Sequence, residues 1–179
     1  MADFQKALNR VLKHEGGFQN HAADRGNYNS LGECVGTNWG IAARTYEAFL
    51  RKPPNARDMK LMTKEEAGEI YRALFWNRIQ GDQITNQPVA DILFDGYVNH
   101  GTAGIRLMQR VLGVTPDGKV GKQTLAAMHA RPSKEVFNQY KQARITFYKN
   151  LVVNRPTNAP FLKGWLNRIN SFTDLDVQL

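Results

Sequence analysis

The chain has 179 residues, of which 42% are hydrophobic and 22% charged, which is typical of a globular protein with one domain or one domain plus a small appended unit. No apolar run approaches the length of a membrane span, and no basic-then-apolar segment opens the chain, so we expect no Sec-type signal peptide. The single cysteine, Cys34, excludes an internal disulfide and a zinc site built from cysteines.

The excess of positive charge lies entirely in the C-terminal part of the chain. Lys and Arg number 24 against 16 Asp and Glu, a formal net charge of +8. Residues 1–100 hold 12 basic and 12 acidic side chains, whereas residues 101–179 hold 12 basic and 4 acidic ones. Such an excess favours an anionic partner: a bacterial wall, a membrane or a nucleic acid. Because no zinc-finger, RRM or basic-zipper signature is present, we expect no nucleic-acid partner.

A carboxylate interrupts the apolar face of the first predicted helix. Within residues 4–17, apolar side chains recur at helical spacing. The next position of this stripe is Glu15, after which Gly16-Gly17 are expected to end the helix in the left-handed conformation. Desolvation disfavours the charged form of a half-buried carboxyl, which suits Glu15 to the role of a proton donor. The alternative is that Glu15 belongs to the solvated last turn of an ordinary helix.

The rest of the chain is predicted to be mostly helical. Residues 18–40 are rich in Gly, Asn, Asp and Ser and predict a loop or an irregular β-hairpin. Further helices are predicted over 41–50, 64–77, 88–101, 103–112, 122–129, 134–152 and 161–172. Asp3, Thr63, Thr102 and Ser133 are the predicted N-caps. The fold class is therefore mainly α, with one small irregular β-hairpin between the first two helices.

Several motifs occur in a characteristic order along the chain. H-E-G-G-F at 14–18 is followed by Asp24-Arg25-Gly26 and by T-N-W-G-I at 37–41. F-D-G-Y-V-N-H-G follows at 94–101, and D-G-x-x-G-x-x-T at 117–124 lies within residues 104–128. G-W-L-N-R at 164–168 completes the series. Together they resemble glycoside hydrolase family 108, the peptidoglycan muramidases of phages and bacteria, with a C-terminal predicted peptidoglycan-binding unit.

The resemblance implies the domain organisation and the partners. It implies a lysozyme-like α+β catalytic part at 1–101 and a helical, peptidoglycan-binding-like part at 102–179 packed against it. Peptidoglycan is the expected partner of a monomeric enzyme without a cofactor. The basic C-terminal part is a candidate contact for an anionic wall or membrane surface. The D-G-x-x-G-x-x-T unit either binds wall peptide or braces the fold.

Glycoside cleavage needs an acid for the leaving oxygen, and a second group that stabilises the oxocarbenium-like transition state or activates water. Glu15 is the candidate acid. Asp24 follows nine residues later, where a hairpin could fold it back, although an Asp-Arg-Gly turn is the alternative role. By analogy with phage-type lysozymes, Thr37 would help to hold the attacking water, unless it is an ordinary strand residue. Because residues 27–36 lengthen the hairpin tip, Ser30 also remains a candidate partner of Glu15.

The remaining site candidates are substrate-binding residues. Tyr46, Trp39 and Trp76 could line a sugar site, and core packing is the alternative role of each. Asn99 could bind substrate, and helix capping is its alternative role. His14-Glu15 lacks the second histidine of H-E-x-x-H, and the other histidines have no metal-ligand spacing, so we expect no metal.

The predicted function is hydrolysis of the β-1,4 bond between N-acetylmuramic acid and N-acetylglucosamine. A phage endolysin is the expected setting, released to the wall through a holin or carried in the virion. A lytic transglycosylase acting on the same bond is one alternative, and a non-catalytic wall-binding or secretion-assisting protein is another.

Overall fold

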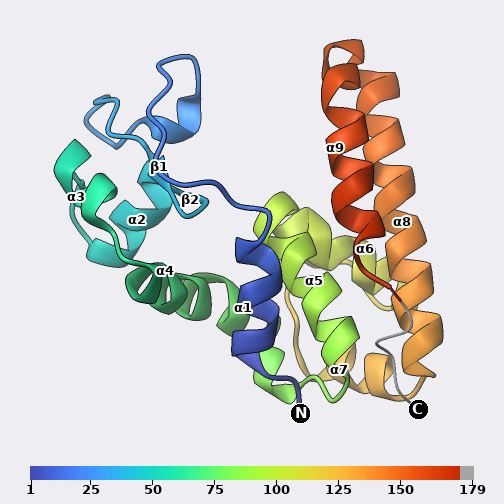
Figure 1. The fold of residues 1–179 in the computed structure, drawn as a ribbon. Coiled ribbons are helices and arrows are strands. Elements are labelled where there is room, and N and C mark those ends of the chain that lie inside the picture. Colours follow the sequence, from blue (N-terminus) through green and yellow to red (C-terminus); the bar gives the residue numbers. More distant parts are fainter. Residues whose placement is uncertain (174–179) are drawn as a thin grey trace. The chain divides into compact units, whose positions relative to one another are not determined.

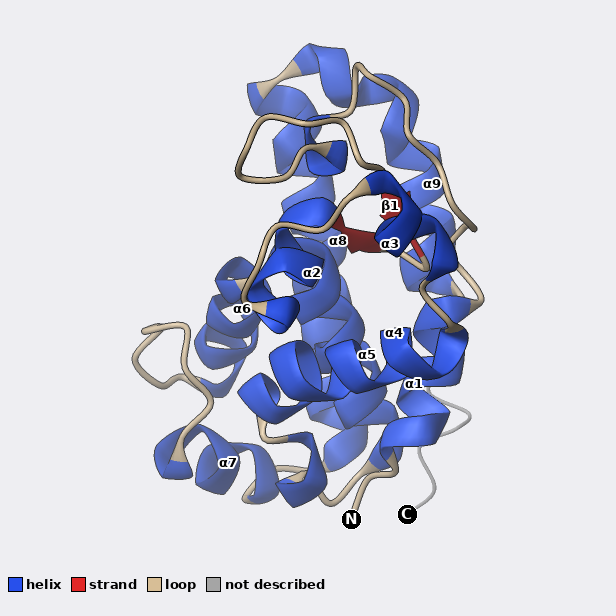
Figure 2. Cartoon of the chain, turned by 90° about the vertical axis from the view of Figure 1, so that its left-hand side faces the viewer, coloured by secondary structure: helices blue, strands red, loops and turns tan. Residues whose placement is uncertain are grey.

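The computed structural model describes residues 1–173, which fold mostly as helices with one two-stranded antiparallel sheet (Figures 1 and 2). The sheet lies between the first two helices in the chain, which confirms the predicted mainly α class with its small hairpin. Within residues 1–173, no helix combines the length and the apolar character that a membrane span requires. The elements are α1 (Phe4–Leu12), η1 (Arg25–Asn27), β1 (Thr37–Asn38), β2 (Ile41–Ala42), α2 (Ala43–Leu50), α3 (Ala56–Leu61), α4 (Lys64–Tyr71), η2 (Arg72–Trp76), η3 (Asn77–Ile79), η4 (Gly81–Gln83), α5 (Gln87–His100), α6 (Thr102–Leu112), α7 (Lys122–His129), α8 (Ser133–Asn154), η5 (Pro156–Asn158) and α9 (Ala159–Asn170).

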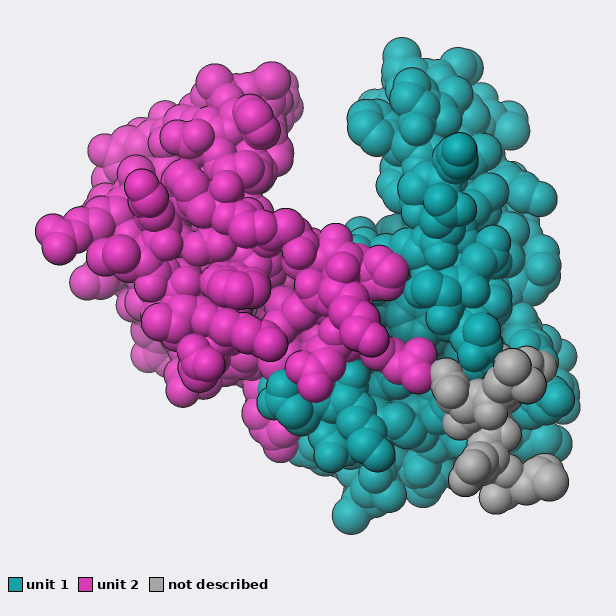
Figure 3. Space-filling model, in the orientation of Figure 1, with its two compact units in different colours: residues 1–7, 75–179 teal, residues 8–74 magenta. Residues whose placement is uncertain are grey.

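The chain packs as two compact units, which Figure 3 colours separately. Unit 2 is Leu8–Leu74 and contains the hairpin with α2, α3 and α4. Unit 1 is Met1–Ala7 together with the chain from Phe75 on, and contains α5 to α9.

The first helix is shorter than predicted. The predicted cap is confirmed, because Asp3 Oδ1 accepts hydrogen bonds from the Gln5 and Lys6 N–H groups at 2.7 and 3.2 Å. At the other end, α1 stops at Leu12, and the His14 and Glu15 N–H groups bond to carbonyls three residues back. This tighter final turn leaves Glu15 beyond the helix. The prediction that Gly16-Gly17 close the helix in the left-handed conformation was wrong, since neither has a positive φ.

The hairpin turns through two residues of positive φ. Thr37 pairs with Ala42 and Asn38 with Ile41, which leaves Trp39 and Gly40 as the loop. Their φ values are 51° and 75°, the signature of a type I′ turn. Glycine suits this conformation, whereas a bulky tryptophan does not. The turn is held by hydrogen bonds from Trp39 N to Asn38 Oδ1 (3.0 Å) and from Trp39 Nε1 to the Met62 carbonyl (3.0 Å).

Unit 2 is completed by helices with strong N-caps. Asn55 forms a full capping box with Asp58 and begins α3, a helix that the sequence reading did not include. Thr63 caps α4 as predicted, accepting from the Glu66 N–H at 3.1 Å. The Glu66 carboxylate, however, accepts from the Tyr46 hydroxyl at 2.6 Å.

Unit 1 is a helical assembly in which α5 packs against α6 and α8, and α8 packs against α9 (Figure 1). Two glycines allow the close packing: a Cβ at Gly96 would overlap the Tyr140 hydroxyl, and one at Gly104 would overlap the Gly96 carbonyl. The predicted side-chain caps of α6 and α8 were wrong. Thr102 and Ser133 are the first residues of these helices, after Gly101 and Pro132, and neither helix has a side-chain cap.

Candidate active site

The carboxylate of Glu15 lies against the hairpin turn of unit 2. Glu15 is half-buried, and a Cβ built on Gly40 would fall 2.5 Å from its Oε2 atom. The same hypothetical Cβ would fall 2.7 Å from the hydroxyl oxygen of Tyr71. Carboxylate and phenol thus approach one point on the Gly40 backbone. The turn needs glycine here both for its φ of 75° and for the room that the carboxylate occupies.

Tyr71 holds the hairpin turn in place through a hydrogen bond to its backbone. Its side chain is 1% exposed, and its hydroxyl donates to the Trp39 carbonyl at 3.0 Å. The strained Trp39-Gly40 peptide is thereby held at three points, by Tyr71, Asn38 and the Met62 carbonyl. Backbone strain persists only where its surroundings enforce it, and it concentrates at functional sites. The surroundings of Glu15 are therefore preorganised.

Asp24 and Thr37 belong to one hydrogen-bonded network. Gln19 Nε2 donates to Asp24 Oδ2 and to Asn27 Oδ1, both at 3.0 Å, and Asn27 Nδ2 returns a bond to Gln19 Oε1 at 2.8 Å. The Thr37 hydroxyl donates to Asn27 Oδ1 at 2.7 Å. The backbones of Gln19 and Thr37 also pair in both directions. Gln19 and Asn27 thus connect Asp24 with Thr37.

The network defines what each of its side chains can still bind. Thr37 has used its proton on Asn27, so its oxygen can only accept, for example from a water or a sugar hydroxyl. Asp24 accepts from Gln19 and, at 2.8 Å, from the Gly26 N–H as the N-cap of η1. Asp24 therefore fills the turn-forming role, while its exposed carboxylate keeps further lone pairs. Ser30, the third candidate, bonds through its N–H to Glu47 Oε2 at 2.8 Å.

The candidate substrate-binding residues lie in different surroundings. Tyr46 is 5% exposed and donates to Glu66; burial and the Glu66 carboxylate raise its pKa. Trp39 is half-buried in the hairpin turn. Asn99 belongs to unit 1, where it is exposed on α5 and donates to the Asp95 carbonyl at 2.7 Å. Trp76 is fully buried in unit 1, which excludes it from sugar stacking.

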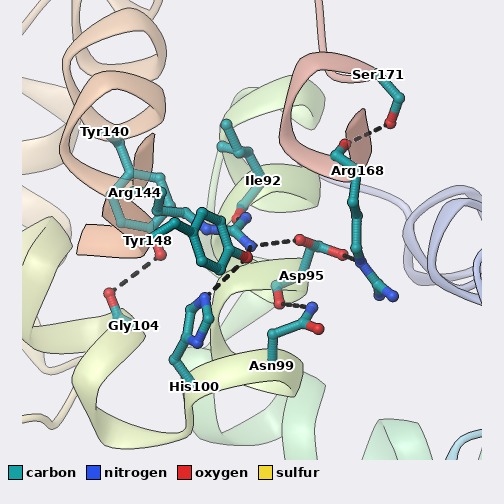
Figure 4. Close-up of polar contacts among 10 residues, drawn as sticks. All are labelled: Ile92, Asp95, Asn99, His100, Gly104, Tyr140, Arg144, Tyr148, Arg168 and Ser171. Atoms are coloured by element: carbon teal, nitrogen blue, oxygen red, sulfur yellow. Dashed lines mark hydrogen bonds and ion pairs between the residues drawn. The ribbon is translucent and has the colours of Figure 1, made fainter. Parts of the chain in front are cut away.

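A buried ionic cluster in unit 1 was not foreseen from the sequence. Asp95 on α5 is fully buried and pairs with Arg144 of α8 at 2.7 Å and with Arg168 of α9 at 2.8 Å (Figure 4). Burial raises the pKa of Asp95, but the two guanidinium charges outweigh it and hold the pKa below its usual range. The available signals were two aspartates, Asp91 and Asp95, within the apolar run of 89–96 and the arginine of G-W-L-N-R.

The cluster extends to a neutral histidine. Arg144 Nη2 donates to the Tyr148 hydroxyl at 3.0 Å, and that hydroxyl lies 3.0 Å from His100 Nε2. Burial and the charge of Arg144 lower the pKa of His100 to about 4, so the ring is neutral at pH 7. The neutral ring can share a hydrogen bond with the Tyr148 hydroxyl in either direction, because that oxygen has a second lone pair beside the one that accepts from Arg144.

Two family models match consecutive parts of the chain. The model of the family described as glycosyl hydrolase 108 matches residues 8–101, and that of the predicted peptidoglycan domain matches residues 103–170. The chain belongs to glycosyl hydrolase family 108. The structure of SagA from Brucella abortus is similar at 30% identity with a TM-score of 0.80, over 97% of this chain and 92% of that one. No curated protein matches the chain significantly.

The family membership establishes the class of activity. It supports a glycoside hydrolase that acts on peptidoglycan, and the C-terminal match supports peptidoglycan as the partner. The likeness to SagA also confirms the predicted lysozyme-like fold. Within residues 1–173, no group of three or more His, Cys, Asp or Glu side chains could hold a metal ion.

The C-terminal motif of this hydrolase is built around a buried glutamine. Gln109 on α6 is 1% exposed and donates through Nε2 to Asp117 Oδ1 at 2.7 Å and to Thr124 Oγ1 at 3.2 Å. Its Oε1 accepts from the Gly118 N–H at 2.8 Å. The hydrogen bond from Gln109 is also the main cause that lowers the pKa of Asp117. In D-G-x-x-G-x-x-T, the aspartate, first glycine and threonine thus brace the turn before α7.

Proposed function

We propose that this hydrolase is an N-acetylmuramidase, cleaving the β-1,4 bond between N-acetylmuramic acid and N-acetylglucosamine, with Glu15 as general acid. The observation that carries the proposal is the half-buried Glu15 carboxylate held on Gly40, beside a strained turn that Tyr71 fixes. Acid catalysis requires a proton donor held in one orientation against the leaving oxygen. Gly40 and Tyr71 supply that constraint.

The hairpin network supplies the second group of the proposed reaction. As Glu15 gives its proton to the glycosidic oxygen, positive charge develops on the sugar ring, and a carboxylate lowers its energy. Asp24 has that charge and is kept in place by Gln19 and Gly26. Thr37 can accept one hydrogen of the attacking water, leaving the water's lone pairs for the anomeric carbon.

A lytic transglycosylase is the second candidate. Both oxygens of Asp24 already accept N–H bonds, and such bonds favour the charged form and weaken a carboxylate as a base toward water. If no base activates water, the C6 hydroxyl of the muramyl residue can attack in its place, with Glu15 first as acid and then as base. The two reactions leave a reducing and an anhydro end, respectively.

The biological setting proposed for the enzyme is that of a phage endolysin. It would reach the wall through a holin or in the virion, and the basic C-terminal part would hold it on an anionic surface. Co-expression with and without a holin tests this role: lysis only with the holin is the expected result, and lysis without one contradicts holin-dependent release.

The decisive experiment is digestion of purified sacculi by Glu15→Gln, with mass spectrometry of the released muropeptides. The change is nearly isosteric and removes the transferable proton, so turnover should fall roughly 10²- to 10⁴-fold with an unchanged circular dichroism spectrum. Glu65→Gln, an exposed carboxylate of α4 in the same unit, is the matched control and should retain full activity. Parental rates in Glu15→Gln would refute the assignment.

Two further variants test whether Asp24 and Thr37 take part in catalysis. Asp24→Asn and Thr37→Val should each lower turnover, and Thr37→Val keeps the branched shape that suits a strand. If both leave the rate within a few-fold of the parent, these residues are structural only. If the products of the parental enzyme carry an anhydro end, the reaction is that of a lytic transglycosylase and not hydrolysis.

A further inference from the structure

Beyond Glu135 in the first turn of α8, the rest of α8 and all of α9 carry basic side chains and no acidic ones. Residues 136–173 contain six Lys and Arg and no Asp or Glu. Three of the six are engaged inside unit 1: Arg144 and Arg168 pair with Asp95, and Lys141 donates to the Phe172 carbonyl at 2.6 Å. The other three, Lys149, Arg155 and Lys163, are exposed. All three lie within about two helical turns of the connection between α8 and α9.

Large apolar side chains are exposed at the same end. Val153, at the end of α8, is 76% exposed, and Phe161, at the start of α9, is 58% exposed. Single exposed apolar residues are ordinary, but these two flank one short connection, η5, among the three exposed cations. Figure 1 shows α8 and α9 side by side, with this connected end projecting from the rest of unit 1.

An aromatic stack supports the exposed ring of Phe161 at this end. Phe161 stacks on Trp165 with centroids 6.0 Å apart and planes at 25°, and Trp165 stacks on the buried Tyr148 at 5.3 Å and 23°. Tyr148 is in turn bonded to Arg144 and His100. The exposed ring is therefore supported by a column of side chains that ends in the buried ionic cluster.

We propose that this end of the α8–α9 hairpin is a docking surface for an anionic lipid bilayer. We call this surface the α8–α9 tip and define it by its residues Lys149, Val153, Arg155, Phe161 and Lys163. Exposed cations attract anionic headgroups, and apolar and aromatic side chains enter the boundary between headgroups and acyl chains. An anionic wall polymer would be held by the cations and could stack on Phe161, but it gives the aliphatic Val153 no partner, so the pair of Val153 and Phe161 favours lipid. The proposal does not rest on which bond the enzyme cleaves.

The test is co-sedimentation of the full chain with vesicles, either of phosphatidylethanolamine with 30% phosphatidylglycerol or of phosphatidylcholine alone. The parental chain should bind the anionic vesicles and not the neutral ones. Each cation near an anionic surface strengthens binding by roughly fivefold, so Lys149→Glu with Lys163→Glu should weaken it at least about 25-fold. Lys52→Glu with Lys64→Glu, exposed positions of unit 2, gives the same net charge and should weaken binding far less.

The apolar side chains distinguish a bilayer from other polyanions. Val153→Ser with Phe161→Ser should weaken vesicle binding roughly tenfold, while Leu61→Ser, 63% exposed on α3, should leave it unchanged. In Phe161→Trp, brominated lipids should quench the fluorescence more than in the parental chain. Binding that falls with charge reversal but not with the serine pair would overturn the proposal in favour of a polyanionic wall polymer. Absence of binding to anionic vesicles would overturn it outright.

Discussion

Protonation of His100 should destabilise unit 1 in mild acid. In the folded protein its Nε2 lies 3.0 Å from the Tyr148 hydroxyl, which accepts from Arg144. Adding a proton to the ring places a second positive charge in a buried position near a buried guanidinium. The unfolded chain does not suffer this penalty, so it takes up the proton at a higher pH than the folded protein does.

The magnitude follows from the two pKa values. Burial and the Arg144 charge lower the pKa of His100 from 6.5 to about 4. Between these values the unfolded state binds more protons, so the free energy of unfolding decreases as the pH falls, and the stabilisation present above pH 6.5 is lost progressively toward pH 4. At 1.36 kcal/mol per pKa unit the full loss is about 3 kcal/mol. Asp95 has a lowered pKa, so the stabilisation that its ionised carboxylate contributes is lost only at pH values below this range.

The assay is urea unfolding followed by circular dichroism at several pH values from 7 to 4.5. His100→Gln, whose amide can hydrogen-bond to the Tyr148 hydroxyl as donor or acceptor, removes the titration. The difference in unfolding free energy between parent and variant should therefore shift by 2 kcal/mol or more across this range. His129→Gln, an exposed histidine at the end of α7, is the control. If the pH dependence of His100→Gln matches that of the parent, the neutral-histidine argument is wrong.

Two further changes test the geometry of each unit. Gly40→Ala would place a methyl group 2.5 Å from Glu15 Oε2 at a φ of 75°, so we expect turnover on sacculi to fall at least tenfold and stability by about 1–3 kcal/mol; full activity would contradict the close packing of turn and carboxylate. Asp95→Asn leaves two guanidinium groups without their carboxylate and should lower the unfolding free energy by about 3–5 kcal/mol. The exposed Glu65→Gln should change it little, and equal effects of the two would refute a special role for the cluster.

Much of the fold could be predicted because its signals are local. The helix from Gln87 to His100 follows from an apolar run that begins with proline in its first turn and ends at Gly101. Asp3 and Thr63 could be identified as caps, since a capping side chain bonds backbone groups two or three residues away. The end of α1 could not, because the helix stops at Leu12, before Gly16-Gly17, and neither glycine takes the left-handed conformation that the prediction relied on.

The sequence by itself determined the family, the helical class and Glu15 as candidate acid, because these depend on residue types at short spacings. Only the tertiary structure could show that Gly40 and Tyr71 position Glu15 and that Gln19 and Asn27 connect Asp24 with Thr37. The same holds for Asp95, whose two arginine partners lie 49 and 73 residues further along the chain. A buried charge or amide finds its partners by packing, and packing brings together residues whose separation in sequence carries no periodic signal.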